Sequence, residues 1–218
     1  EWSPKPLKAN ADKAFQGSIV LGMGFVLTDD QARRMLDDAP SNADVLFPYL
    51  NGQDLNTDPK QKPSRWVINF WDWPEDRARV YRAPYEWLRE NVYPERLEKS
   101  KQKSYKNIMS MWWLHWNARP GLYHAIGRGH HFEKHLKKWD PQKEPMERVL
   151  AVTRVSKTLA FSFVSAGMVF SDATVAFSLN GYDDFAVLQS GVYAAFAWQH
   201  ASRLKSDLRY SPTDALEP

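Results

Sequence analysis

The chain has 218 residues, enough to bury the core of one domain, and its 25% charged and 43% hydrophobic residues are typical of a folded protein rather than a disordered one. A net charge of +3 permits binding to polyanions but is far below that of a histone-like protein. The absence of cysteine excludes disulfides, thiolate zinc sites and cysteine nucleophiles.

The N-terminal part of the sequence predicts a strand followed by a helix. Residues 18–27 are β-branched and glycine-rich, which favours a strand that contains a bend. Thr28 can cap a helix whose first turn holds Asp29 and Asp30, because acidic side chains there face the positive end of the helix dipole.

The middle of the chain predicts a loop, a strand and then helices. Residues 45–64 contain Asn, Gly and Pro and predict a loop with at most a brief strand, whereas the aromatic residues 65–73 predict a strand buried on both faces. Residues 75–118 predict helices interrupted by prolines. An aromatic stripe at helical spacing within them is typical of a core: Met109, Trp112, Trp113 and Trp116.

Charge is unevenly distributed along this first half. Aspartates gather before residue 60, and a basic run follows that comprises Lys99, Lys101, Lys103 and Lys106. We therefore expect the two ends of the domain to differ in the sign of their charge.

The C-terminal part predicts short strands and a closing helix. Residues 128–147 are polar and rich in breakers, so we expect an exposed insertion. Short apolar runs then predict strands at 149–155, 158–164, 167–170 and 173–179. Residues 182–201 predict one helix, capped by Asp183 or Asp184, with an inward face of Phe185, Leu188, Val192 and Phe196. The pattern as a whole predicts an α+β fold, a mostly antiparallel sheet flanked by helices.

Sequence signatures of catalysis are missing. The chain has no nucleophile elbow, phosphate loop, Asn-Pro-Pro-aromatic methyltransferase motif or Mg²⁺-nuclease pattern. His131 and His135 could share one face of a helix, but their spacing is not that of zincins, so a hydrolase using His131, His135 and Asp140 is an alternative that requires a bound metal. A protein-interaction or assembly module is the other alternative.

Two cationic clusters suggest recognition instead. Arg154, Ser156, Lys157 and Thr158 lie where a turn joins two apolar runs, and Arg can bond guanine while hydroxyls reach phosphates or base edges. An ordinary polar hairpin tip explains these residue types equally well. The second cluster follows the last predicted helix and could clamp phosphates or form a solvated helix exit: Arg203, Lys205, Arg209 and Tyr210, with Ser202 and Ser206.

The sequence resembles a known family at these clusters and around them. The stretches "VLFPYLNGQDLN", "SRWVINFWDWP", "RVLAVTRVSKTLAFSFV", "VFSDATVAF", "FAVLQSGVYAAFAW" and "LKSDLRYSPTD" are similar, in order, to the target-recognition region of type IIL (MmeI-like) restriction-modification enzymes and of related adenine-specific DNA methyltransferases of phage-defence systems. The resemblance covers roughly residues 17–216.

The resemblance implies a role for each cluster. Base choice in the family varies around the segment that matches "TRVSKTL", which makes Arg154, Ser156, Lys157 and Thr158 the candidates for reading bases. Stretches like "LKSDLRY" recur in members that read different sequences, which implies backbone contacts or structure for Arg203, Lys205, Arg209 and Tyr210. The partner implied is double-stranded DNA.

The resemblance also implies a larger parent protein. Residues 1–16 would be a linker from a preceding methyltransferase domain, and residues 17–216 the recognition domain. This chain itself would need no cofactor or metal, whereas the parent would use S-adenosylmethionine, with Mg²⁺ and a fused endonuclease left open. No apolar run reaches the roughly 18 residues that span a bilayer, and no signal peptide is evident, so we expect a cytoplasmic protein without a membrane partner.

Overall fold

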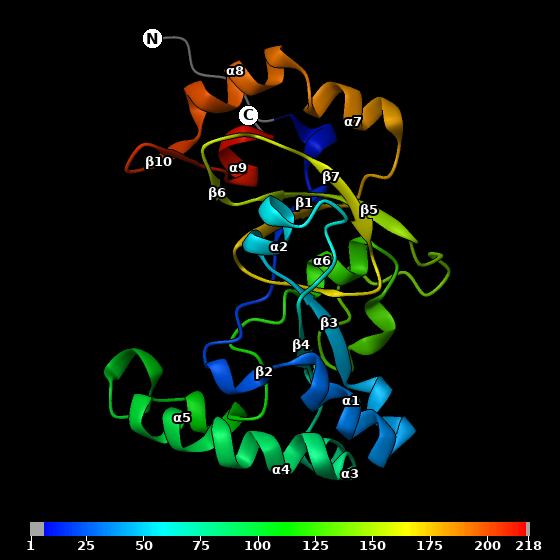
Figure 1. The fold of residues 1–218 in the computed structure, drawn as a ribbon, viewed down its shortest axis with the longest axis vertical. Coiled ribbons are helices and arrows are strands. Elements are labelled where there is room, and N and C mark those ends of the chain that lie inside the picture. Colours follow the sequence, from blue (N-terminus) through cyan, green and yellow to red (C-terminus); the bar gives the residue numbers. More distant parts are fainter. Residues whose placement is uncertain (1–6, 217–218) are drawn as a thin grey trace.

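The computed structural model describes residues 7–216, which form strands and helices throughout (Figure 1). The strands are β1 (Ala14–Gln16), β2 (Val26–Leu27), β3 (Leu46–Leu50), β4 (Arg65–Ile68), β5 (Arg148–Thr153), β6 (Val155–Ser156), β7 (Ser162–Ser165), β8 (Val169–Phe170), β9 (Thr174–Phe177), β10 (Ser202–Leu204) and β11 (Asp207–Arg209). The α-helices are α1 (Asp29–Asp38), α2 (Gly52–Thr57), α3 (Glu75–Val80), α4 (Arg82–Asn91), α5 (Tyr93–Lys99), α6 (Pro120–Ala125), α7 (Tyr182–Leu188), α8 (Gly191–His200) and α9 (Pro212–Ala215). Short 3-10 turns include η2 (Met23–Phe25), η4 (Lys103–Tyr105), η5 (Ile108–Met111) and η6 (Gly129–His131).

Three sheets organise the described residues. A four-stranded antiparallel sheet has the order β1-β9-β5-β7, and a second four-stranded sheet has the order β2-β4-β3-β8, in which only the β3–β8 pair is parallel. A small antiparallel sheet has the order β10-β11-β6. The predicted α+β fold with mostly antiparallel sheets flanked by helices is confirmed.

The strand predicted at residues 18–27 is largely wrong. Ser18 and Ile19 form isolated bridges, and the backbone then turns at Leu21 and Gly22, which have φ of 51° and 142°. Only Val26 and Leu27 return to a sheet, as β2. The positive φ angles break the ladder, because residues in that region cannot continue an extended strand.

The helix predicted after Thr28 is confirmed, and a second helix was missed. Thr28 caps α1 through a capping box with Gln31. Within the stretch 45–64, predicted as a loop, Asn51 caps α2 in the same way by accepting from the backbone N–H of Asp54 over 3.2 Å. Asn51 therefore begins a helix here rather than marking a loop.

The proline-interrupted helices of the middle segment are confirmed as α3, α4 and α5, and Tyr85, Leu88 and Val92 form their buried face. The strand predicted at 65–73 ends at Ile68, and the chain then turns through Trp71, which has φ of 56°. The aromatic stripe is buried at Trp112 and Trp113 but lies on η5 and a turn rather than on an α-helix.

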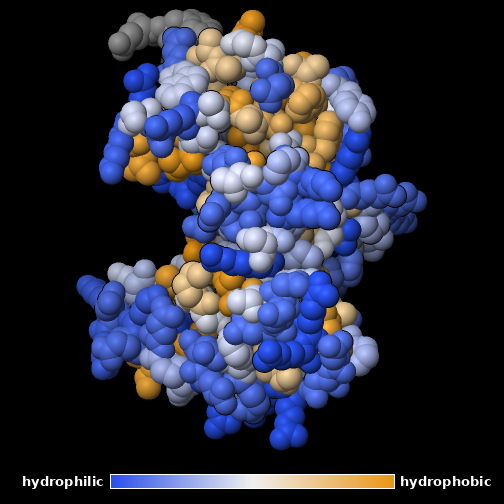
Figure 2. All heavy atoms as spheres, in the orientation of Figure 1, coloured by the Kyte–Doolittle hydropathy of each residue, from blue (hydrophilic) through white to orange (hydrophobic). Residues whose placement is uncertain are grey.

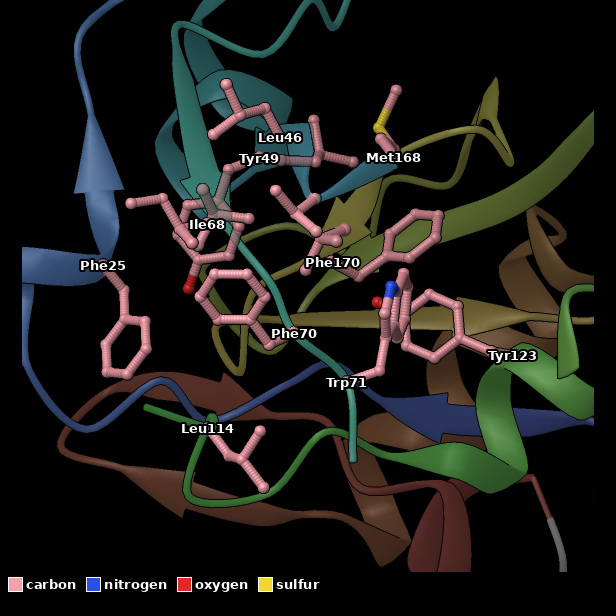
Figure 3. Close-up of a cluster of buried hydrophobic side chains, with 14 of the residues drawn as sticks. Phe25, Leu46, Tyr49, Ile68, Phe70, Trp71, Leu114, Tyr123, Met168 and Phe170 are labelled. Carbon is pink, nitrogen blue, oxygen red and sulfur yellow. The ribbon is translucent and has the colours of Figure 1, made fainter. Parts of the chain in front are cut away.

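The larger hydrophobic cluster lies between the sheet that contains β3 and β4 and the segments packed on it. Figure 3 shows Phe70, Trp71 and Phe170 among its side chains, with Tyr123 of α6 against Trp71. The ring centroids of Trp71 and Tyr123 are 4.8 Å apart in an edge-to-face arrangement. A second cluster joins the β1-β9-β5-β7 sheet to α7, α8 and the C-terminal strands.

Two predicted segment boundaries need correction. Residues 1–6 of the predicted linker lie outside the described residues. Ala14–Gln16 of the same linker form β1, which pairs with β9 in the β1-β9-β5-β7 sheet. Within the predicted exposed insertion 128–147, residues 133–138 and 140–145 are exposed, whereas Gly129 and Phe132 are buried.

The predicted helix over 182–201 is divided into α7 and α8. Ser190 caps α8 by accepting from the backbone N–H of Tyr193 over 3.1 Å, so the helical register restarts there. Leu188 is buried as predicted, whereas Val192 is 82% exposed because it lies in the first turn of the new helix. Asp183 and Asp184 lie in the first turn of α7 and do not cap it; the N-cap residue is Gly181.

Candidate nucleic-acid interface

The two cationic clusters belong to one sheet. The predicted tight hairpin at 154–158 is wrong: the chain bends at Arg154, and Val155 and Ser156 form β6, which pairs with β11. Strand β7 then returns to pair with β5, with Ala151 opposite Ser162. The turn residues of the first cluster and the hairpin residues of the second therefore lie next to each other on the β10-β11-β6 sheet.

Hydrogen bonds fix the backbone of Arg154 on both sides. Its N–H donates to the carbonyl oxygen of Ala173 over 2.8 Å, and its carbonyl oxygen accepts from the N–H of Tyr210 over 2.7 Å. Helix α2 supports the preceding residue, since the Thr153 hydroxyl donates to the side-chain oxygen of Asn56 over 3.0 Å. The cationic side chain is thus carried on backbone that is held in one position.

The guanidinium of Arg154 reaches a surface pocket of about 280 Å³. The side chain is half-buried, and Nη1 lies 3.5 Å from the carbonyl oxygen of Asp172. The pocket is also lined by residues from β1, β10 and β11, namely Gln16, Ser202 and Arg209. Arg154 and Arg209, one from each predicted cluster, therefore share a single cavity.

The other residues of the first cluster lie at the bend after β6. Lys157 and Thr158 are exposed, and Ser156 is half-buried. The Ser156 hydroxyl accepts from the backbone N–H of Thr158 over 3.2 Å, so it stabilises the turn. Lys157 and Thr158 are free to extend into solvent from a structured turn.

The second cluster forms the β10–β11 hairpin. Arg203, Lys205 and Arg209 are exposed, and Lys205 begins the two-residue turn with φ of 57°. A positive φ at that position suits the right-handed twist of a two-residue hairpin, although Gly or Asn is usual there. The Arg203 guanidinium lies 5.9 Å from the ring centroid of Trp198.

For Tyr210 the resemblance implied either a contact with the DNA backbone or a structural role. Its position in the fold supports the structural role. It is 1% exposed and packs in the second hydrophobic cluster. The hydroxyls of Tyr193 and Tyr210 are 2.5 Å apart, and burial raises the pKa of Tyr210 well above its usual value. Its side chain lies in the interior, where it cannot contact a phosphate of a bound duplex.

Sequence reasoning missed Arg119, which bonds to a residue that lines the same pocket as Arg154. Arg119 precedes α6 with φ of 55°, and its guanidinium donates to the Gln16 side chain over 2.9 Å and to the Gly17 carbonyl over 3.3 Å. Partial burial and the nearby charge of Arg154 lower its pKa, while Asp172 acts in the opposite direction. The partners of this arginine are about 100 residues away in the sequence, so no local pattern indicates its role.

The surface is hollowed on the side where the β10–β11 hairpin projects. Figure 2 shows a notch between the upper and lower parts of the molecule, and in Figure 1 the β10–β11 hairpin projects on that side from above while α5 and the segment after it project from below. We call this hollow the notch. Its upper edge is the cationic β10-β11-β6 sheet.

The histidines singled out in the sequence have structural partners. The ring of His131 stacks on Trp71 at a centroid distance of 4.3 Å, and burial lowers its pKa to about 3. His135 Nδ1 lies 2.9 Å from a carboxylate oxygen of Asp72, which also accepts backbone N–H groups of residues 133–135. Within residues 7–216 no group of three or more His, Asp or Glu side chains could hold a metal ion.

Of the comparisons with known proteins, the one with solved structures finds a likeness. No family model matches the chain, and no curated protein matches it. Among solved structures, the chain is similar to part of the type IIL restriction-modification enzyme MmeI, solved in complex with DNA, with a TM-score of 0.68 at 16% identity. The likeness covers 99% of this chain and 25% of that enzyme, so the chain spans about a quarter of its length. At this identity the likeness shows a shared fold.

No helix between residues 7 and 216 has the length and apolar composition needed to cross a bilayer.

Proposed function

We propose that the chain is the DNA target-recognition module of an adenine-specific DNA methyltransferase of a restriction-modification or phage-defence system. The module binds duplex DNA and positions it for a catalytic domain outside this chain, which flips and methylates an adenine with S-adenosylmethionine. The chain itself makes no covalent change.

The observation that carries this proposal is the union of the two cationic clusters in one sheet. Arg154 and Arg209 line a common pocket, Lys157 and Lys205 extend from neighbouring turns, and Arg119 donates to a residue that lines this pocket. Cations held on a fixed β-scaffold can combine phosphate contacts, which set the register, with contacts to base edges, which select the sequence. The fold shared with part of a restriction-modification enzyme bound to DNA supports the same interpretation.

The roles within the sheet follow from the chemistry of the side chains. Arg154 can donate two parallel hydrogen bonds to a guanine, and Lys157 and Thr158 can reach a base edge from the same turn. Arg203, Lys205 and Arg209 on the hairpin supply charge for the phosphate backbone on either side.

Selection from a library of random duplexes tests the proposal. The chain is incubated with duplexes that contain a randomised central stretch, and the bound fraction is sequenced after several rounds. Enrichment of one short motif supports sequence recognition. Retention of duplexes without any enriched motif would reduce the role to non-specific binding, and no retention would overturn it.

A protein-interaction module is the second candidate, favoured by an apolar surface. Tyr182, Val187 and Val192 on α7 and α8 are 70%, 65% and 82% exposed, and Figure 2 shows hydrophobic residues over these helices. Exposed apolar patches mark docking surfaces. This candidate predicts duplex binding that is weak and insensitive to salt, because only phosphate contacts release counterions.

A further inference from the structure

A basic segment on the other edge of the notch has no role in the interface described above. It runs from the end of α5 through η4 to residue 106 and carries Lys99, Lys101, Lys103 and Lys106. Lys99 pairs with Glu95 at 2.6 Å, and Lys101 pairs with Glu98. Lys103 and Lys106 are exposed and form no ion pair with any of the residues 7–216, so their charges are available to a ligand.

Arg96 anchors the base of this segment in the protein interior. It is fully buried, and its guanidinium donates to the carbonyl oxygens of Leu114 over 2.6 Å and of Val20 over 2.8 Å. Those carbonyls belong to the segments 111–114 and 20–21, so helix α5 is held against both of them.

A second contact holds the lysine-bearing turn itself. The ring of Tyr105, which lies between Lys103 and Lys106, meets the ring of Trp116 edge to face at a centroid distance of 5.3 Å. Trp116 precedes Asn117, whose backbone bonds to Ile19, and Arg119 follows two residues later. The turn is thus packed against the segment that carries Arg119.

The two edges of the notch therefore carry charge of the same sign. In Figure 1 the green segment after α5 and the β10–β11 hairpin project on the same side of the molecule, and Figure 2 shows the hollow between them. Arg119 donates to Gln16, which lines the same pocket as Arg154, so a further cation lies next to that pocket. An elongated polyanion that lies along the hairpin would have the lysine segment facing it.

We propose that the lysine segment, Lys101 to Lys106, is a second edge of the DNA-binding surface and contacts the phosphate backbone of the same duplex that the β10-β11-β6 sheet reads. This inference rests on the proposed function. Lysine suits the task because its ammonium is a point charge on a flexible stem that follows a phosphate without fixed geometry. The contact strengthens binding to every sequence and selects none.

The test compares two triple variants with the same change in charge. Lys101, Lys103 and Lys106 are replaced by Ala in one protein. Lys134, Lys137 and Lys143, exposed on the loop that projects from the opposite side of Figure 1, are replaced by Ala in the matched control. Fluorescence anisotropy with a random-sequence duplex of about 25 base pairs gives the affinity at several salt concentrations, and circular dichroism checks that both variants stay folded.

The expected result is a loss that is specific to the lysine segment. The Lys101/Lys103/Lys106 variant should bind about tenfold more weakly, with a salt slope reduced by about 2 to 3, since each lost phosphate contact lowers the slope by about 0.9. The control triple should change the slope little. Equal losses in both triples, or an unchanged slope in the first, would overturn the inference while the binding of the unmodified chain still supports the proposed function. Absence of salt-dependent binding by the unmodified chain would overturn both.

Discussion

The backbone N–H of Tyr210 donates a hydrogen bond to the carbonyl oxygen of Arg154 over 2.7 Å, which joins two segments that are far apart in the sequence. Val155 and Arg209 extend the pairing as opposite residues of β6 and β11. Because Tyr210 is buried and its hydroxyl contacts that of Tyr193, this junction is anchored in the core. The junction determines where the cations around it point.

Substitution of Lys157 should affect sequence choice, and substitution of Lys205 should not. Lys157→Ala removes a side chain proposed to reach one base pair, so discrimination at that position should fall by about 1–3 kcal/mol. Lys205→Ala removes a phosphate contact and should weaken all duplexes similarly. Competition binding with the selected motif and its single-base variants measures both effects. Equal losses on cognate and random duplexes for Lys157→Ala would refute its assigned role.

Replacing Lys205 by Gly should separate stability from binding. Lys205 has φ of 57°, a conformation that Gly adopts without steric cost, so Lys205→Gly should raise the free energy of unfolding by up to about 1 kcal/mol. The same change removes a cation from the hairpin and should weaken duplex binding. Urea unfolding and anisotropy on one preparation give both values. A variant that is both less stable and unchanged in binding would contradict the account of the hairpin.

Arg119 should contribute to binding through its guanidinium rather than through charge alone. Its guanidinium donates to Gln16 and to Gly17, so Arg119→Lys keeps the positive charge but loses the fixed orientation of these hydrogen bonds. We expect Arg119→Gly to weaken duplex binding about tenfold to hundredfold, on the order of one charged hydrogen bond, and Arg119→Lys to recover only part of it. Full recovery by Lys would show that geometry is not needed.

Arg96 should be essential for stability. Its guanidinium donates to backbone carbonyls of two segments, those of Trp112 and Leu114 in one and that of Val20 in the other, and lies over the ring of Phe25 at 4.8 Å from the centroid. Arg96→Met leaves those buried carbonyls without donors, which should lower the free energy of unfolding by at least about 3 kcal/mol in urea titrations. The control Arg89→Met, at an exposed pair with Glu86, should change it by less than about 0.5 kcal/mol. Equal effects of the two substitutions would contradict the anchoring role.

Acidification should destabilise the fold through two histidines. Burial lowers the pKa of His115 and of His131 to about 3, whereas an unfolded histidine titrates near 6.5. Above pH 6.5 the two histidines are neutral in both the folded and the unfolded state, so the free energy of unfolding does not depend on their titration. Below pH 6.5 the unfolded state alone binds the proton, so each histidine should cost about 2 kcal/mol between pH 7 and pH 5.

The substitution His131→Phe isolates one of these two contributions. Phenylalanine can keep the stacking on Trp71 but cannot be protonated. Urea unfolding at several pH values should therefore show a smaller loss of stability between pH 7 and pH 5 for the variant, by about 2 kcal/mol. An identical pH dependence in both proteins would contradict the assignment.

The sequence predicted those features that depend on local pattern. The capping residue Thr28, the buried face of α4 and the strands β5, β7, β8 and β9 are visible as residue types at fixed spacing, whereas β10 and β11 were not predicted. The break at Ser190 could not be predicted, because a serine within an apolar run can lie inside a helix or cap the start of a new one. The structure shows that it is a cap. The misplacement of Val192 follows from that ambiguity.

The arrangement of the candidate site could not be predicted, because it depends on contacts distant in sequence. The residue types of both cationic clusters were identified, but the pairing of β6 with β11 that brings them together has no local signature. Arg119 was missed for the same reason, since its partners Gln16 and Gly17 are reached only through folding. The sequence shows which cationic residues are present, whereas the pairing of distant strands decides which of them lie together.

Site-specific photo-crosslinking tests the central claim most directly. A photoreactive amino acid replaces Lys157 in one protein and Lys143, on the opposite side, in another, and each is irradiated with a duplex at a concentration where the unmodified chain is bound. The account predicts crosslinks to DNA from position 157 and none from position 143. Binding of the duplex with no crosslink from position 157, or with equal crosslinking from both positions, would contradict the claim that the β10-β11-β6 sheet faces DNA.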